Sequence, residues 1–125
     1  MRKILVAEDD VLLATLHEIT LREAGFEVLV CRDGEQALAA MDAFDPDLLI
    51  TDFFMPRMTG GELIKATRRL RGARTAVLLA SGRDEHQLKE DERGDARLEK
   101  PITPARLLGA VRALEARFAA GCLAA

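Results

Sequence analysis

The segment Leu48–Asp52, which reads LLITD, places an aspartate directly after a nearly continuous apolar run. A short apolar run of this kind is typical of a strand in a parallel sheet that is buried on both faces. The same arrangement occurs at Ile4–Ala7, which Glu8, Asp9 and Asp10 follow. These two segments indicate an α/β fold with acidic side chains at its strand ends.

Two later apolar runs also end beside reactive or charged side chains. Ala76–Ala80 is followed by Ser81, and Leu98 lies two residues before Lys100. In an open α/β sheet, ligand chemistry collects beyond the carboxyl ends of the strands. The residues that we expect together at this edge are Glu8, Asp9, Asp52, Ser81 and Lys100.

Helical signals separate the apolar runs, so that strand and helix alternate five times. Such alternation predicts a doubly wound parallel sheet with helices on both faces. In the first helix, Leu12, Leu16 and Ile19 form one apolar stripe, as expected of a core-facing helix. The expected caps are the pairs Asp33–Gln36 and Thr59–Glu62, and the last helix is expected to open at Thr103 and Pro104 and to bury Leu107, Val111, Leu114 and Phe118.

The segment from Gly82 to Gly94 does not show the apolar pattern of the other predicted helices. It is dense in charge, and Leu88 is its one large apolar residue. A helix with a single apolar anchor packs weakly. We therefore expect the fourth of five helices to be short or irregular, and to be the least stable element.

Length and charge restrict the class of protein. The 125 residues suit one domain, residues 1–125, with a tail at 119–125 that is too short to tether another domain. A net charge of −3 makes nucleic-acid binding through counterion release improbable. No apolar stretch reaches the roughly 20 residues that span a bilayer, and the start resembles no signal peptide. We expect a cytoplasmic domain that binds neither nucleic acid nor membrane.

The residues at the predicted sheet edge suit phosphoryl transfer. Clustered carboxylates repel one another unless a cation neutralises them, and oxygen ligands suit Mg²⁺. An ionised Asp52 is a possible nucleophile toward phosphorus. Lys100, the Ser81 hydroxyl and backbone amides after Asp52 would neutralise the phosphoryl oxygens. Individually, Glu8 to Asp10 could be an acidic helix start, and Ser81 or Lys100 a turn residue, but their joint occurrence at four strand ends favours a site.

The chain resembles the receiver domain of bacterial two-component response regulators, the CheY-like family, over essentially its whole length. The elements that match are Ile4–Asp10, Asp52–Gly60, Ser81 and Lys100–Pro101. The resemblance implies a flavodoxin-like sheet of five parallel strands in the order 2-1-3-4-5. It also implies a cis peptide before Pro101.

By the same resemblance, Asp52 is the phospho-acceptor, and the donor is a sensor histidine kinase or a histidine phosphotransfer protein. Asp9, Asp52 and the backbone carbonyl of Phe54 would bind Mg²⁺ directly, and Glu8 would act through water. Asp10 would either join them or cap the first helix. Ser81 would bond a phosphoryl oxygen and Lys100 would pair with it.

One departure from the family concerns the switch. Receivers commonly carry Tyr or Phe three residues before the lysine, where this chain has Arg97. We therefore expect the switch to involve Ser81, Arg97 and the charged segment from Gly82 to Gly94, with Arg97 exchanging carboxylate partners among Asp84, Glu85, Glu90, Asp91 and Glu92. Phe54 and Arg83 occupy the two positions that modulate phosphoryl-group lifetime in this family.

Several functions share this chemistry. The leading one is a stand-alone receiver, not an enzyme, whose output is the binding of a downstream target protein. A phosphate shuttle or sink, and a receiver fragment of a hybrid histidine kinase or a longer regulator, remain open. A phosphatase with an aspartyl nucleophile is disfavoured, because such enzymes usually place a second acid two residues after the nucleophile, where this chain has Phe54.

Overall fold

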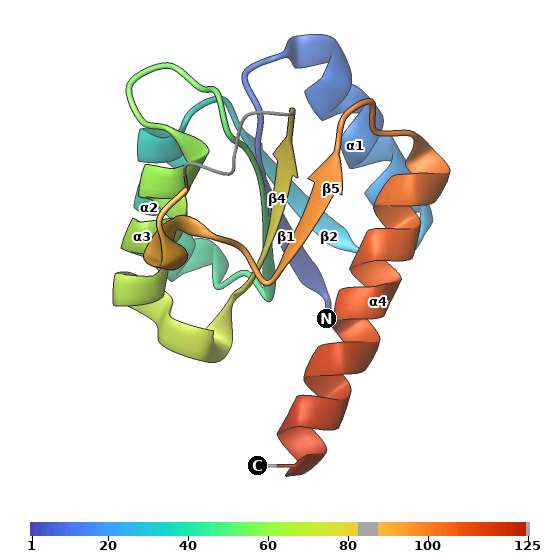
Figure 1. The fold of residues 1–125 in the computed structure, drawn as a ribbon. Helices are drawn as coiled ribbons and strands as arrows, with labels where there is room; N and C mark the ends of the chain where they lie inside the picture. Colours follow the sequence, from blue (N-terminus) through green and yellow to red (C-terminus); the bar gives the residue numbers. More distant parts are fainter. Residues whose placement is uncertain (83–87, 125) are drawn as a thin grey trace.

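The computed structural model describes the chain at residues 1–82 and 88–124. Five parallel strands form one sheet in the order β2-β1-β3-β4-β5, which confirms the expected fold class and strand order (Figure 1). The strands are β1 (Lys3–Ala7), β2 (Glu27–Cys31), β3 (Leu48–Asp52), β4 (Ala76–Ser81) and β5 (Ala96–Glu99).

Helices cover both faces of the sheet. Helices α1 (Val11–Glu23) and α4 (Pro104–Ala124) lie on one face, and α2 (Gly34–Phe44) and α3 (Gly60–Arg71) lie on the other (Figure 1). The sequence led us to expect five helices. The described residues contain four α-helices and two 3-10 turns, η1 (Gly72–Arg74) and η3 (Glu90–Glu92). Only η3 lies between β4 and β5, and residues 83–87 of that connection lie outside the described part.

The predicted helix caps are present. Asp33 accepts a hydrogen bond from the backbone amide of Gln36 at 2.8 Å. Thr59 and Glu62 form a reciprocal capping box at the start of α3, with both hydrogen bonds at 3.1 Å. Such caps satisfy amide groups that have no partner inside the helix. They fix where α2 and α3 begin, and so fix the loops that precede them.

Two apolar cores flank the sheet. The core under α1 and α4 includes Leu21, Leu107 and Val111, and the core under α2 and α3 includes Met41 and Leu63. In α4, Leu107, Val111 and Leu114 are buried and Phe118 is half-buried, as predicted. The helix continues to Ala124, so the expected tail begins inside it. Leu88 packs into the core under α3, which makes it the apolar anchor that we expected for the charged segment.

The prediction for the inward face of α1 is wrong. Leu12, Leu16 and Ile19 are exposed, Leu12 by 84%, and the buried residues of α1 are Ala14, His17, Thr20 and Leu21. Both sets have helical spacing, so periodicity alone does not choose between them. The side chain of Asp10 caps the helix by accepting from the amides of Leu12 and Leu13. Asp10 therefore takes one of the two roles expected for it, that of capping the first helix.

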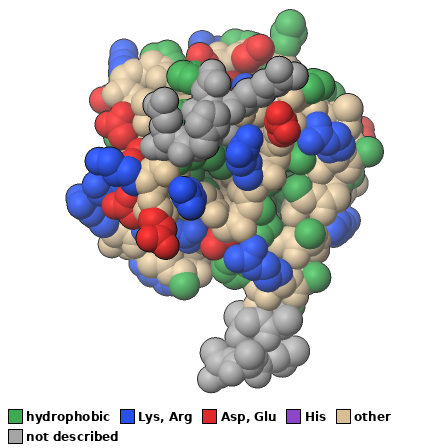
Figure 2. Space-filling model, viewed as in Figure 1, with side chains coloured by type: hydrophobic (Ala, Val, Ile, Leu, Met, Phe, Trp, Pro, Cys, Tyr) green, Lys and Arg blue, Asp and Glu red, His purple; other side chains and the backbone are tan. Residues whose placement is uncertain are grey.

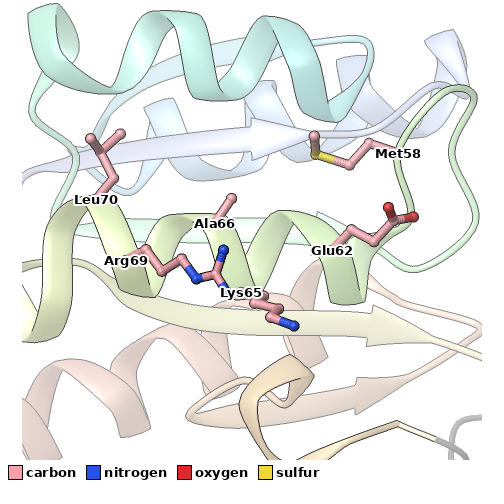
Figure 3. A pocket seen from close by; sticks show the side chains of 6 residues that line it. All are labelled: Met58, Glu62, Lys65, Ala66, Arg69 and Leu70. Atoms are coloured by element: carbon pink, nitrogen blue, oxygen red, sulfur yellow. The ribbon is translucent and has the colours of Figure 1, made fainter.

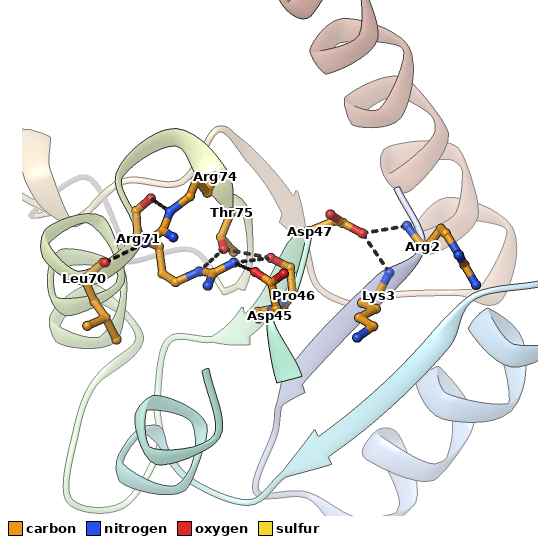
Figure 4. A network of polar contacts seen from close by, with 9 residues as sticks. All are labelled: Arg2, Lys3, Asp45, Pro46, Asp47, Leu70, Arg71, Arg74 and Thr75. Carbon is orange, nitrogen blue, oxygen red and sulfur yellow. Dashed lines mark hydrogen bonds and ion pairs between the residues drawn. The ribbon is translucent and has the colours of Figure 1, made fainter. Parts of the chain in front are cut away.

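A polar network ties together the amino ends of the strands (Figure 4). The buried guanidinium of Arg71 donates to Thr75 Oγ1 at 2.9 Å, to the carbonyl of Pro46 at 3.3 Å and to Asp45. Thr75 Oγ1 donates to the same carbonyl of Pro46 at 2.8 Å. Asp47 then accepts from the amides at the start of β1. The network anchors β1, β3 and β4 at the sheet edge opposite Asp52.

Candidate functional site

The carboxyl ends of four strands meet at one edge of the sheet. Glu8 follows β1, Asp52 ends β3, Ser81 ends β4 and Lys100 follows β5. The strand register pairs Ala7 with Thr51, and Asp52 with Ala80. Parallel pairing therefore brings the expected residues to the same edge of the fold.

Asp52 and Lys100 form the central contact of this edge. Lys100 Nζ lies 2.9 Å from Asp52 Oδ1, and the backbone amide of Phe53 donates to the same oxygen at 2.9 Å. Burial disfavours the charged form of Lys100, but the hydrogen bond and negative charge of Asp52 outweigh it and raise the pKa of the lysine above its usual value. Lys100 is thus held as a cation against the carboxylate of Asp52. The peptide bond between Lys100 and Pro101 is cis, as the resemblance implied.

Glu8, Asp9 and Asp52 form an acidic cluster. One carboxylate oxygen from each lies within 4.8 Å of the others. Glu8 is 3% exposed, and burial, with the negative charge of Asp52 adding to it, raises the pKa of Glu8 from 4.5 to about 7. Glu8 resists ionisation chiefly because burial disfavours its charged form.

The donor set of this cluster fits a hard divalent cation. Carboxylate oxygens with solvent access are the ligands with which Mg²⁺ is held, usually together with several waters. Asp9 is exposed, so the cluster opens to solvent on one side. A cation bound here would reduce the repulsion between these carboxylates.

Ser81 is fully buried and contacts both β5 and the lysine that follows this strand. Its backbone carbonyl accepts from the amide of Lys100 at 2.8 Å, and its hydroxyl oxygen accepts from Arg97 Nε at 3.0 Å. Sequence reasoning paired Arg97 with carboxylates and missed the contact with Ser81. Asp84 and Glu85, two of the expected partners, lie outside the described residues. The contact between Arg97 and Ser81 follows from the register of β4 and β5, which places Arg97 opposite Leu79.

The loop between β3 and α3 is folded back onto Asp52. The amide of Gly60 donates to the carbonyl of Phe53 at 2.7 Å, and a Cβ atom on Gly60 would overlap the backbone carbonyl of Asp52. Only glycine fits this approach. The ring of Phe54 is 68% exposed and packs edge-on against Phe53, with 4.9 Å between ring centroids. Arg83, the other lifetime position, lies outside the described residues.

An exposed apolar stripe on α1 begins beside the acidic cluster. We call it the α1 stripe; it consists of Val11, Leu12, Leu16 and Ile19. Val11 also lines a small cavity of about 140 Å³ that reaches Glu8. Large exposed apolar patches often mark surfaces that bind other proteins. The α1 stripe is therefore a candidate docking face next to Asp52's edge of the sheet.

A second concave surface runs along α3, from Met58 in the loop before this helix to Leu70 near its end (Figure 3). This groove has a volume of about 540 Å³, and its lining combines Met58, Ala66 and Leu70 with the charged side chains of Lys65 and Arg69. None of these residues belongs to the acidic cluster.

The described surface has no strong charge bias on the side that Figure 2 shows. Lys and Arg side chains lie among Asp and Glu side chains there (Figure 2). Within the described residues, no helix has both the length and the apolar character needed to cross a membrane.

Comparisons with known proteins agree with the observed fold. A family model described as the response regulator receiver domain matches residues 4–112. The transcriptional regulatory protein CpxR of Klebsiella pneumoniae is 37% identical over 115 residues, which make up 91% of this chain and 49% of that protein. The DNA-binding response regulator MtrA of Mycobacterium tuberculosis is 35% identical over 113 residues, 90% of this chain and 50% of that protein. The chain spans about half the length of the curated relatives it matches.

Solved structures match the chain over nearly their whole length. The chemotaxis response regulator CheY4 of Vibrio cholerae aligns with a TM-score of 0.81 and 31% identity, and covers 90% of this chain and 97% of that one. The receiver domain of the Francisella response regulator 1452 aligns with a TM-score of 0.82 and 30% identity. The alignment covers 94% of this chain and 99% of that one. The matched family model, the relatives and the fold together place this chain in the response regulator receiver domain family of two-component systems.

Proposed function

We propose that this receiver domain accepts a phosphoryl group on Asp52 from a phosphohistidine of a sensor kinase or a histidine phosphotransfer protein. The observation that carries the proposal is the contact of 2.9 Å between Lys100 Nζ and Asp52 Oδ1, beside the acidic cluster. The contact places a cation against the carboxylate that would attack phosphorus, at the edge where the acidic cluster lies.

In the proposed reaction, an oxygen of Asp52 forms a bond to phosphorus while the bond between phosphorus and the histidine nitrogen breaks. The electron pair of the broken bond returns to the imidazole, and Asp52 becomes an acyl phosphate. Lys100 then pairs with a phosphoryl oxygen, and Ser81 donates its hydroxyl proton to another. Such fixed charges and donors account for most of the catalysis of phosphoryl transfer.

Glu8, Asp9, Asp52 and the backbone carbonyl of Phe54 are the proposed ligands for Mg²⁺, with Glu8 acting through water. When bound, Mg²⁺ supplies the positive charge that allows acidic side chains and phosphoryl oxygens to lie close together.

The α1 stripe supports docking of the phosphodonor protein. Its residues recur at helical spacing, as in helices that pack against another helix. A partner helix that buried Leu12 and Leu16 would lie next to the edge where Asp52 ends β3. Apolar anchors at this spacing are typical of helix recognition.

Phosphorylation would then change the binding of a downstream target protein. We place the switch at Ser81, Arg97 and the charged segment from Gly82 to Gly94. Glu90–Glu92, a single 3-10 turn, contributes no buried residue, which is consistent with a weakly held element.

A receiver that forms part of a longer regulator is the second candidate. The observation that favours it is that the match covers only about half of relatives named as transcriptional and DNA-binding regulators. In that case the downstream partner would be an output domain on the same chain. The length of the native protein in cell extracts, measured by immunoblot, distinguishes the two.

The central test is labelling at Asp52. The protein is incubated with Mg²⁺ and phosphoramidate, a small donor with the phosphorus–nitrogen bond of phosphohistidine, and the intact mass is measured. Wild type should gain one phosphoryl group and Asp52→Asn none. Asp42→Asn removes an exposed acid on α2 by the same chemical change and should label like wild type. Equal labelling of Asp52→Asn and wild type would disprove the assignment.

A further inference from the structure

The contact between Arg97 and Ser81 has a fixed direction. Arg97 Nε lies 3.0 Å from Ser81 Oγ, and a terminal guanidinium nitrogen lies 3.4 Å from the carbonyl of Gly82. Arginine has donors but no acceptor. In this contact the serine oxygen therefore accepts, and the hydroxyl's own proton is left for an acceptor other than Arg97.

The surroundings make this contact more than an incidental surface interaction. Ser81 is fully buried, whereas Arg97 projects from β5, the edge strand of the sheet, and is exposed. A long exposed side chain loses rotamer freedom when it is held against a buried group. The amide of Lys100 contacts the backbone carbonyl of Ser81, whereas Arg97 contacts its hydroxyl oxygen.

We infer that Arg97 is a positioning residue that orients the Ser81 hydroxyl as a hydrogen-bond donor toward the phosphoryl group on Asp52. This inference rests on the proposed function. Without the guanidinium, the hydroxyl can turn its lone pairs and its proton among other neighbours, and fewer molecules present the donor in the required direction. Arg97 acts through Ser81 and does not itself contact the reacting atoms.

The inference predicts a specific pattern of coupling between two substitutions. Beryllofluoride, which imitates the phosphoryl group, is titrated in saturating Mg²⁺ against wild type, Ser81→Ala, Arg97→Ala and the double variant. We expect each single change to weaken binding by about threefold to tenfold, the range for one hydrogen bond. The double variant should bind no more weakly than Ser81→Ala alone, because Arg97 has nothing left to orient.

Three further measurements separate orientation from other effects. Arg69→Ala removes one positive charge from the groove along α3, whose lining residues do not include Ser81, and should bind beryllofluoride like wild type. Arg97→Lys keeps the charge but lacks the rigid planar donors, and should recover less than half of the lost affinity. Mg²⁺ affinity without beryllofluoride should be equal in wild type and Arg97→Ala.

The outcomes also separate this inference from the proposed function. If the effects of Ser81→Ala and Arg97→Ala multiply in the double variant, or if Arg97→Lys restores full affinity, the positioning role is overturned while Asp52 remains the acceptor. If wild type binds no beryllofluoride and gains no phosphoryl group on Asp52, the proposed function itself fails. Urea unfolding of each variant confirms that the compared proteins are folded.

Discussion

Replacing Glu8 with glutamine isolates the charge of one buried carboxyl. Glutamine has nearly the same shape, and its side-chain oxygen can still accept from the amide of Asp10, a hydrogen bond of 3.2 Å in this structure. The glutamine side chain, however, never ionises. In wild type, burial first and then the charge of Asp52 raise the pKa of Glu8 to about 7, while the amide of Asp10 and the charge of Lys100 oppose the rise.

The size and sign of the effect follow from this pKa. The folded protein holds the proton of Glu8 more tightly than the unfolded chain does, so the free energy of unfolding falls as the pH rises from about 4.5 to about 7. Because a tenfold change in proton affinity is worth about 1.4 kcal/mol, the full loss is about 3 kcal/mol. Below pH 4.5 this stability is fully present, and above pH 7 it is gone.

Urea unfolding in the absence of Mg²⁺ measures this effect. Between pH 5 and pH 8, Glu8→Gln should become more stable relative to wild type by about 2 kcal/mol. The comparison with wild type matters, because burial, with Lys100 adding to it, lowers the pKa of His17, and that group shifts stability in the opposite direction. Glu23→Gln, an exposed acid on α1, is the matched control and should follow wild type.

Adding Mg²⁺ at pH 8 should remove most of the difference in unfolding free energy between wild type and Glu8→Gln, because a cation favours the ionised form of Glu8. A gap between wild type and Glu8→Gln that stays constant from pH 5 to pH 8 would refute the reasoning. So would a wild-type protein at pH 8 whose stability does not respond to Mg²⁺.

Four other substitutions test separate parts of the structure. Lys100→Ala should keep Mg²⁺ binding but weaken the beryllofluoride response at least tenfold, because its ammonium pairs with Asp52, the proposed acceptor; an unchanged titration would make it an ordinary surface lysine. Gly60→Ala should destabilise the fold by about 2 kcal/mol in urea, since its methyl group would overlap the Asp52 carbonyl. Arg71→Met should cost about 2 kcal/mol by leaving buried oxygen acceptors without their donor, and a neutral result would show that water replaces the guanidinium. Leu12→Ser should change stability by less than about 0.5 kcal/mol and leave phosphoramidate labelling intact, but slow transfer from a phosphohistidine protein; equal transfer rates would exclude the α1 stripe from docking.

The sheet could be predicted from sequence because strand burial and strand ends leave local marks. The run LLITD ends in Asp52, and the all-buried pattern of β3 follows from its apolar residues. The caps at Asp33 and Thr59 are also local, since each involves residues three positions apart. Both kinds of signal lie within a few residues of one another, so no knowledge of the fold is needed to find them.

Other features depend on contacts that periodicity does not encode. The inward face of α1 was misjudged because Leu12 and Leu16 are more apolar than His17, which is nonetheless buried. The contact of Arg97 with Ser81 depends on the register of β4 against β5, which emerges only when the strands pair.

The polar network around Arg71 has a consequence for protein engineering. It fastens the amino ends of β1, β3 and β4, and none of its residues belongs to the loops beside Asp52 (Figure 4). Anchoring and reactivity are thus assigned to opposite ends of the same strands. Loops at the carboxyl end can be exchanged between receivers while this clamp keeps the strands in register. We therefore expect the fold to tolerate grafted loops at the end of the sheet where Asp52 lies.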